Sequence, residues 1–179
     1  DIEAIYNQGF YSFVDVDIRR DEDGAAVIFS VQENPKIDSI NFTGNTIYTT
    51  EQLMSEVFSQ EGTVFNRVFF RNDLDRIQEH YHKDGYVMVR VSDVQIQGGD
   101  IYVTILEPRL GDIIIQGNRK TKTYVIQREL KMKKGDNFNV TKFRHHLGKL
   151  QGLGYFEDVN VAFDVPEDDD TTVDLILTV

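Results

Sequence analysis

The sequence predicts an α+β fold made of tandem copies of a β-α-α-β-β unit. A run of alternating apolar and polar residues ending in Gly-Asn, residues 37–46, returns as residues 112–118, and its glycines are 73 positions apart. Gly62 returns as Gly135 at the same spacing, and each copy closes with two apolar strands. Because a segment that recurs at a fixed spacing indicates a repeated structural unit, we expect one unit to be used more than once.

Residues 1–35 are predicted to be the C-terminal part of such a unit, a helix followed by a β-hairpin. Apolar residues at helical spacing end at Gly9, and alternating strands follow over residues 13–18 and 26–31. Six positions match the end of the chain at an offset of 145: Ile2, Ile5, Gly9, Phe10, Val14 and Val16 precede Leu147, Leu150, Gly154, Tyr155, Val159 and Val161.

Residues 36–108, the second repeat, are predicted to be a complete unit. Its expected elements are a strand up to Gly44, a short helix capped by Thr49 or Thr50, a helix over about residues 67–83, and strands over residues 87–91 and 101–106. The turn at Asp84-Gly85 ends the longer helix.

Residues 109–179, the third repeat, show the same order of elements. They are a strand over residues 113–115, a helix through Ile126 and Leu130, a helix through Leu147 and Leu150, and strands over residues 159–163 and 173–179. Gly154 follows Gly85 by only 69 positions, so the second helix is expected to be four residues shorter. Four residues are about one helical turn, so the buried face keeps its direction.

Composition excludes several classes of function. The net charge of −11 argues against nucleic acid as the main partner. The charge is uneven, because residues 1–35 carry 2 basic and 8 acidic residues, residues 36–108 carry 6 and 11, and residues 109–179 carry 11 and 11. There is no cysteine, no apolar run long enough to span a membrane and no visible signal peptide. The start at Asp1 is expected for a piece of a longer protein.

No motif indicates catalysis, a cofactor or a metal site. The histidines occur as His80-Tyr81-His82 and His145-His146, and His at i and i+2 do not share a helix face, so a solvated helix surface is expected. The acidic run 167–170 lacks the spaced ligands of a calcium loop and reads as a hairpin turn. We therefore expect a protein that is not an enzyme.

The repeated features resemble the POTRA (polypeptide-transport-associated) domain. The resemblance is carried by the strands ending in Gly44-Asn45 and Gly117-Asn118, the junctions Gly85-Tyr86 and Gly154-Tyr155-Phe156, and the terminal strands 101–107 and 173–179. The stretch from residue 125 to residue 159 is most similar to the POTRA domain nearest the membrane barrel in BamA-type outer-membrane insertases.

This resemblance implies a three-stranded mixed sheet packed on two antiparallel helices in each unit. It also implies a periplasmic arm of an outer-membrane protein that receives unfolded outer-membrane β-barrel proteins, docks accessory assembly subunits and precedes its own C-terminal membrane barrel. A two-partner secretion transporter or a plastid protein-import channel of the plastid envelope is the alternative within the family. A KH-like RNA-binding domain is a more distant alternative, against which the acidic charge and the missing basic GxxG loop count.

An exposed sheet edge leaves backbone N–H and C=O groups free, so an extended client can add a strand there. Positions carried over from the family place the candidate edges at Val14, Val16 and Ile18; at Met88, Arg90, Ser92 and Val94; and at Val159, Asn160, Val161 and Phe163. Polar residues such as Arg90 and Ser92 have the alternative role of protecting an edge. Basic residues of the third repeat, Arg119, Lys120, Lys122, Lys131, Lys133 and Lys134, form a candidate surface for lipid head groups or an acidic partner.

Overall fold

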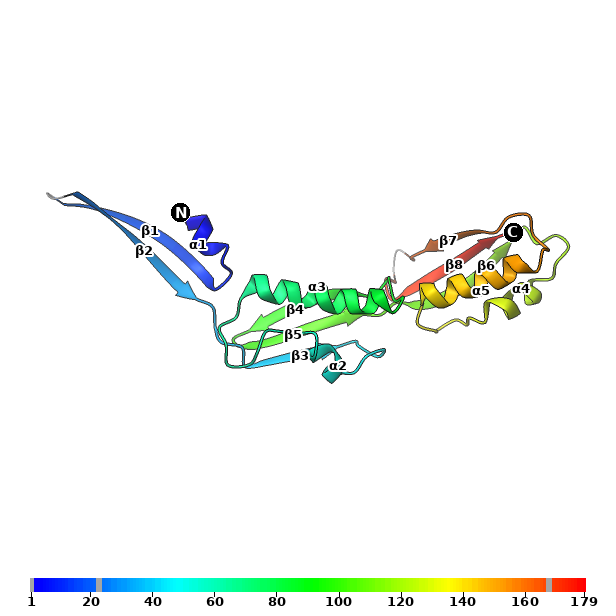
Figure 1. Cartoon of the computed structure of the whole chain (residues 1–179), viewed down its shortest axis with the longest axis horizontal. Helices are drawn as coiled ribbons and strands as arrows, with labels where there is room; N and C mark the ends of the chain where they lie inside the picture. Colours follow the sequence, from blue (N-terminus) through cyan, green and yellow to red (C-terminus); the bar gives the residue numbers. More distant parts are fainter. Residues whose placement is uncertain (1, 22–23, 167–168) are drawn as a thin grey trace. The chain divides into compact units, whose positions relative to one another are not determined.

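The computed structural model describes residues 2–21, 24–166 and 169–179 (Figure 1). The chain divides into two compact units, residues 1–78 with 91–105 and residues 79–90 with 106–179. The elements in chain order are α1 (Ile2–Tyr6), β1 (Tyr11–Asp21), β2 (Gly24–Glu33), β3 (Ser39–Thr43), α2 (Thr50–Met54), α3 (Arg67–Lys83), β4 (Arg90–Gln97), β5 (Asp100–Leu106), β6 (Arg109–Gln116), α4 (Thr123–Leu130), α5 (Val140–Gly152), β7 (Asn160–Asp164) and β8 (Thr172–Thr178). No described helix is long and apolar enough to cross a membrane.

The first compact unit holds the β1–β2 hairpin and a three-stranded sheet in the order β3-β5-β4. Strands β3 and β5 are parallel, with Ile40 opposite Ile101 and Phe42 opposite Val103. These four side chains are buried. The alternation seen in the sequence therefore directs one face of the sheet into the core.

The second compact unit holds a sheet in the order β6-β8-β7, together with α4 and α5. Strand β6 is parallel to β8 and β7 is antiparallel to it, so the sheet is mixed. Its core consists of Leu110, Ile126, Leu130, Phe138, Phe143, Leu150, Val159, Leu175 and Leu177. The predicted α+β fold with three-stranded mixed sheets is confirmed.

The Gly-Asn marker that revealed the repeat has a structural reason. Gly44 and Gly117 have φ angles of +80° and +84°, in the region that favours glycine. A Cβ atom on either residue would lie 2.1 or 2.2 Å from the carbonyl oxygen at the end of the neighbouring strand, Ile105 in one repeat and Val179 in the other. A side chain is therefore excluded at both positions.

The helices follow the prediction closely. The side chain of Thr49 accepts a hydrogen bond from the N–H of Gln52, whose side chain in turn accepts from the N–H of Thr49, so Thr49 caps α2. Helix α3 has 17 residues and α5 has 13, which is the four-residue difference expected from the spacing of the repeats.

Candidate protein-binding sheet edges

Of the three edges for which client binding was predicted, one lies on β1 of the β1–β2 hairpin and two belong to the three-stranded sheets. β4 lies at one edge of the sheet β3-β5-β4, and β7 lies at one edge of the sheet β6-β8-β7. Within the described chain neither strand has a second partner strand, so the backbone groups on its outer side are available for pairing.

The edge strand β4 borders a groove that it shares with α3. The groove has a volume of about 280 Å³ and is lined by Arg67, Phe70, Arg71, Leu74, Asp75, Gln78, Val91 and Val94. Val91 and Val94 come from the strand, whereas Phe70 and Leu74 come from the helix. An open backbone edge thus lies beside apolar side chains with polar ones around them, which is the combination that a strand-adding peptide requires.

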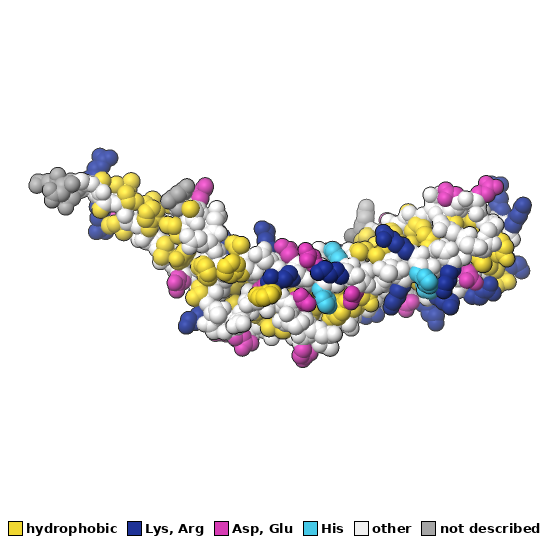
Figure 2. Space-filling model, viewed as in Figure 1, with side chains coloured by type: hydrophobic (Ala, Val, Ile, Leu, Met, Phe, Trp, Pro, Cys, Tyr) yellow, Lys and Arg dark blue, Asp and Glu magenta, His cyan; other side chains and the backbone are white. Residues whose placement is uncertain are grey.

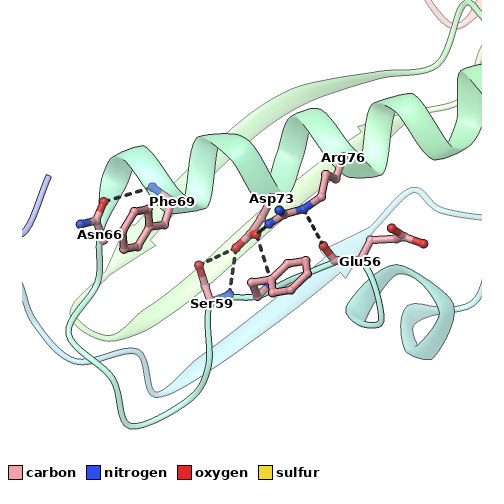
Figure 3. A network of polar contacts seen from close by, with 7 residues as sticks. Glu56, Ser59, Asn66, Phe69, Asp73 and Arg76 are labelled. Carbon is pink, nitrogen blue, oxygen red and sulfur yellow. Dashed lines mark hydrogen bonds and ion pairs between the residues drawn. The ribbon is translucent and has the colours of Figure 1, made fainter. Parts of the chain in front are cut away.

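A buried polar network holds another face of α3 in place (Figure 3). The side chain of Asp73 is fully buried and accepts hydrogen bonds from the N–H groups of Phe58 at 3.0 Å and Ser59 at 2.9 Å. Arg76 forms an ion pair with Asp73 and donates from Nε to the carbonyl oxygen of Glu56 at 3.3 Å. The loop after α2 is therefore tied to α3, which keeps the groove-lining face of the helix in a defined position.

Two asparagines at equivalent positions anchor the starts of α3 and α5. Asn66 and Asn139 are buried, and each caps its helix through its Oδ1 atom. The Oδ1 of Asn66 accepts a hydrogen bond from the N–H of Val68 at 2.9 Å, and that of Asn139 accepts one from the N–H of Lys142 at 3.0 Å. The Nδ2 of Asn66 donates to the carbonyl of Gln8 at 2.8 Å, and that of Asn139 donates to the carbonyl of Asp84 at 2.7 Å. Sequence reasoning missed both residues, although their 73-residue spacing was a usable signal.

The four residues predicted for the β4 edge have different surroundings. Val94 lines the groove, Arg90 pairs with Asp170 at 2.6 Å, and Ser92 donates from its hydroxyl to the carbonyl oxygen of Thr104 on β5 at 3.1 Å. The assignment of Met88 to the edge strand is wrong. It lies in a turn before β4 and packs against the core of the second compact unit.

At the β7 edge, most of the predicted residues point into the fold. Val159 is wrong as an edge-strand residue, because it precedes β7 and is buried in the core. Val161 packs against the same core, and the ring of Phe163 lies 5.0 Å from that of Phe138. Asn160 is exposed and is the predicted residue whose side chain faces away from the core.

The β1–β2 hairpin carries apolar side chains on one face. Val14, Val16 and Ile18 lie opposite Val31, Phe29 and Val27 in the antiparallel register, and Ile18 is 60% exposed. Figure 2 shows hydrophobic side chains exposed along this hairpin. At the 145-residue offset Val16 and Ile18 match Val161 and Phe163, which pack on the core, so this face is the counterpart of a core-facing surface.

The predicted basic surface divides into two places. Arg119 and Lys120 line a groove of about 590 Å³ that also contains Asn160, and Lys122 is the N-cap residue of α4. Lys131, Lys133 and Lys134 line a different groove, between β6 and α4.

Among the described residues, the histidines and the acidic run belong to no group that could hold a metal ion. His145 is exposed, but His146 is half-buried and its Nδ1 atom is buried with no hydrogen-bond partner in the described chain, which corrects the expectation of a fully solvated pair. Of the acidic run, Glu167 and Asp168 lie outside the described residues, and Asp169 accepts hydrogen bonds from Thr171 and Thr172, which lower the pKa of Asp169.

Comparison with known proteins identifies the family. The family model of POTRA, described as the surface antigen variable number repeat, matches residues 35–107 and 108–179. The chain belongs to the POTRA family. The two matched segments cover the sheets β3-β5-β4 and β6-β8-β7, so the tandem POTRA arrangement is confirmed.

Relatives of these POTRA domains occur in outer-membrane assembly factors. The outer membrane protein assembly factor BamA of Nitratidesulfovibrio vulgaris is 27% identical over 169 residues, which cover 87% of this chain and 21% of that protein. The chain therefore spans about a fifth of the length of this relative. POTRA domains 1–3 of the periplasmic domain of Omp85 from Anabaena superpose with a TM-score of 0.75 at 26% identity, covering 99% of this chain and 77% of that chain.

The two-partner secretion alternative has weaker support. CdiB from Escherichia coli has a TM-score of 0.68 at 20% identity, over 81% of this chain and 27% of that chain. This likeness shows the fold alone. The sequence similarity favours the POTRA region of an assembly factor of the BamA and Omp85 type.

Proposed function

We propose that this chain is the periplasmic receiving region of an outer-membrane protein assembly factor, which binds unfolded outer-membrane proteins by adding a client strand to β4. Accessory assembly subunits dock through the same kind of edge, including β7. The region acts by binding and has no catalytic role of its own. The observation that carries the proposal is the groove beside the open edge of β4.

Strand addition suits a receptor that must accept many clients. Backbone hydrogen bonds do not depend on the client's side chains, so they supply affinity without selecting one sequence. Every second side chain of an added strand points to the same face. The half-buried Leu74, Val91 and Val94 provide apolar contacts for those side chains, and the rim residues Arg71 and Asp75 are exposed to water.

A pair of variants on β4 tests this proposal. Val94→Glu places a carboxylate beside the apolar side chains of the groove, whereas Ile96→Glu makes the same change on an exposed side chain of the same strand that does not line the groove. With a fluorescent peptide of alternating Val and Thr, we expect Val94→Glu to weaken binding about tenfold, because the charge must be buried or the groove left empty. Ile96→Glu is expected to change the Kd less than about twofold.

Circular dichroism of both variants provides the control for folding. Equal weakening by the two variants, or no weakening by either, would show that the client does not occupy this groove.

A further inference from the structure

A second groove lies between β6 and α4 in the second compact unit. Its volume is about 690 Å³. It is lined by the apolar Ile113, by the exposed Tyr124 and by four basic residues, Arg128, Lys131, Lys133 and Lys134. Figure 2 shows Lys and Arg side chains gathered toward the C-terminal end of the chain. The edge predicted from the sequence for this repeat, on β7, does not line the groove.

The groove lies beside an open backbone edge. β6 pairs with β8 on one side. On its other side Leu110 exchanges backbone hydrogen bonds with Gly135 and Asp136, and no described strand pairs with β6 beyond that point. The carbonyl of Gln116 faces β8, where it accepts from the N–H of Val179 at 3.0 Å. Because the direction of backbone groups alternates along a strand, those of Ile113 and Ile115 point toward the open side. A polypeptide lying there would therefore find both donors and acceptors.

The positive charge of the groove is only partly neutralised. Lys134 pairs with Asp112 at 2.8 Å, and Arg128 pairs with its neighbour Glu129 at 3.2 Å. The other two basic residues have no carboxylate partner in the part of the chain that the structure describes. All four are exposed, so their charges remain available to a ligand.

One of these unpaired residues occupies an unfavourable backbone position. Lys131 ends α4 with a φ of 50°, and no other described residue except glycine has a positive φ. Glycine is the preferred residue at such a helix end because it lacks a Cβ atom. Backbone geometry therefore does not favour a lysine at this position, and the residue adds an exposed positive charge to the groove.

The second repeat shows that the charge is not a property of the fold. The ten lining positions of the groove hold four basic residues and one acidic residue, a formal charge of +3. The positions 73 residues earlier hold three acidic residues and no basic one, a charge of −3. They are Asp38, Ser39, Ile40, Glu51, Met54, Ser55, Phe58, Ser59, Gln60 and Glu61.

A buried acidic residue of the second repeat is also replaced by a histidine in the third repeat. The buried Asp73 of α3 corresponds to His146 of α5 at the same spacing. Burial lowers the pKa of His146, and the positive charges of His145, Lys149 and Lys131 lower it further. The shift is consistent with a positive potential on this side of the third repeat.

We propose that the groove between β6 and α4 binds an extended acidic segment of a protein partner, which pairs its backbone with the open edge of β6 and its carboxylates with the basic residues. Charge complementarity defines the partner's side chains, and the free backbone groups of the edge favour a polypeptide over a lipid head group. This site is separate from the β4 groove and does not depend on client binding there.

A short fluorescent peptide of alternating Glu and Val is the probe, with a Gln and Val peptide as its neutral counterpart. We expect the acidic peptide to bind the whole chain, with an affinity that falls as salt is added, and the neutral peptide to bind more weakly. The double variant Lys131→Gly and Lys133→Gln should weaken binding about tenfold. It should not lower the melting temperature, because glycine relieves the backbone at position 131.

Two controls separate the possible explanations. Arg119→Gln with Lys120→Gln removes the same charge from the same repeat outside this groove and should change the Kd less than about twofold. Val94→Glu should have no effect, so failure of this proposal is distinguishable from failure of the proposed client site.

The amides of Ile113 and Ile115 should gain protection from hydrogen exchange when the acidic peptide binds. Equal losses from the two double variants would indicate diffuse attraction and overturn the proposal. So would equal affinity for the two peptides, or binding to phosphatidylglycerol vesicles without binding to the acidic peptide.

Discussion

Replacing the buried Asp73 by alanine is expected to destabilise the second repeat by about 2–4 kcal/mol. The carboxylate accepts from the N–H groups of Phe58 and Ser59 and pairs with Arg76. Each hydrogen bond to a charged group contributes about 1.5–3 kcal/mol to the free energy of unfolding. The alanine variant loses these bonds, but it also avoids the cost of taking a carboxylate out of water on folding, which offsets part of the loss. The loop after α2 should then lose its attachment to α3.

Native-state hydrogen exchange of the α3 amides is the appropriate assay, because it reports the stability of the second repeat by itself. Asp75→Ala, at an exposed position of the same helix, is the matched control and should change stability by less than about 0.5 kcal/mol. A value for Asp73→Ala within 0.5 kcal/mol of the control would refute the reasoning that the network holds the loop on the helix.

Three further changes test other parts of the account. Asn139→Ala should lower the free energy of unfolding in denaturant by about 1–2 kcal/mol, because it removes the N-cap of α5. Asn139→Asp keeps a capping oxygen and should recover part of this loss. Equal stability of both variants and the wild type would contradict the capping role of Asn139. Gly44→Ala should lower the free energy of unfolding by more than about 2 kcal/mol and Gly62→Ala by about 1 kcal/mol. Both glycines have a φ of +80°, but only a Cβ atom at Gly44 would meet a carbonyl oxygen. Similar melting temperatures of the two variants would be inconsistent with that close approach. Burial lowers the pKa of His146, so at low pH the unfolded chain binds a proton that the folded chain does not. The free energy of unfolding should therefore fall as the pH drops below about 6.5, by at most about 1.4 kcal/mol per pH unit. If the free energy of unfolding of His146→Asn depends on pH in the same way, this residue is not the cause.

Much of the fold could be predicted because the repeat supplied its own comparison. Helix α3 begins and ends at the residues expected from its apolar spacing, and α5 is four residues shorter, as the offset indicated. The start of β4 was placed too early. The residues from Val87 to Val89 are all apolar, but Val89 is buried before the strand begins, and the preceding residues form a turn. An apolar run alone does not distinguish a strand from a buried turn.

The candidate sites were less predictable because they combine residues that are distant in the chain. Val94 was placed at an edge by its position in the family resemblance, but Phe70 and Leu74 join it only because α3 packs along β4. The groove beside β6 was missed for the same reason. Its basic residues were recognised as a cluster, yet the sequence did not show that Lys131 and Ile113 line one groove.

Hydrogen exchange of the β4 amides, with and without the peptide of alternating Val and Thr, tests strand addition most directly. A client that adds a strand forms hydrogen bonds with the outward backbone groups of β4, so every second amide within residues 90–97 should exchange more slowly in the complex. The exposed amides of the other elements should be unchanged. Protection confined to α3 or to the β1–β2 hairpin, with the β4 amides exchanging as in the free protein, would contradict the proposed mode of binding.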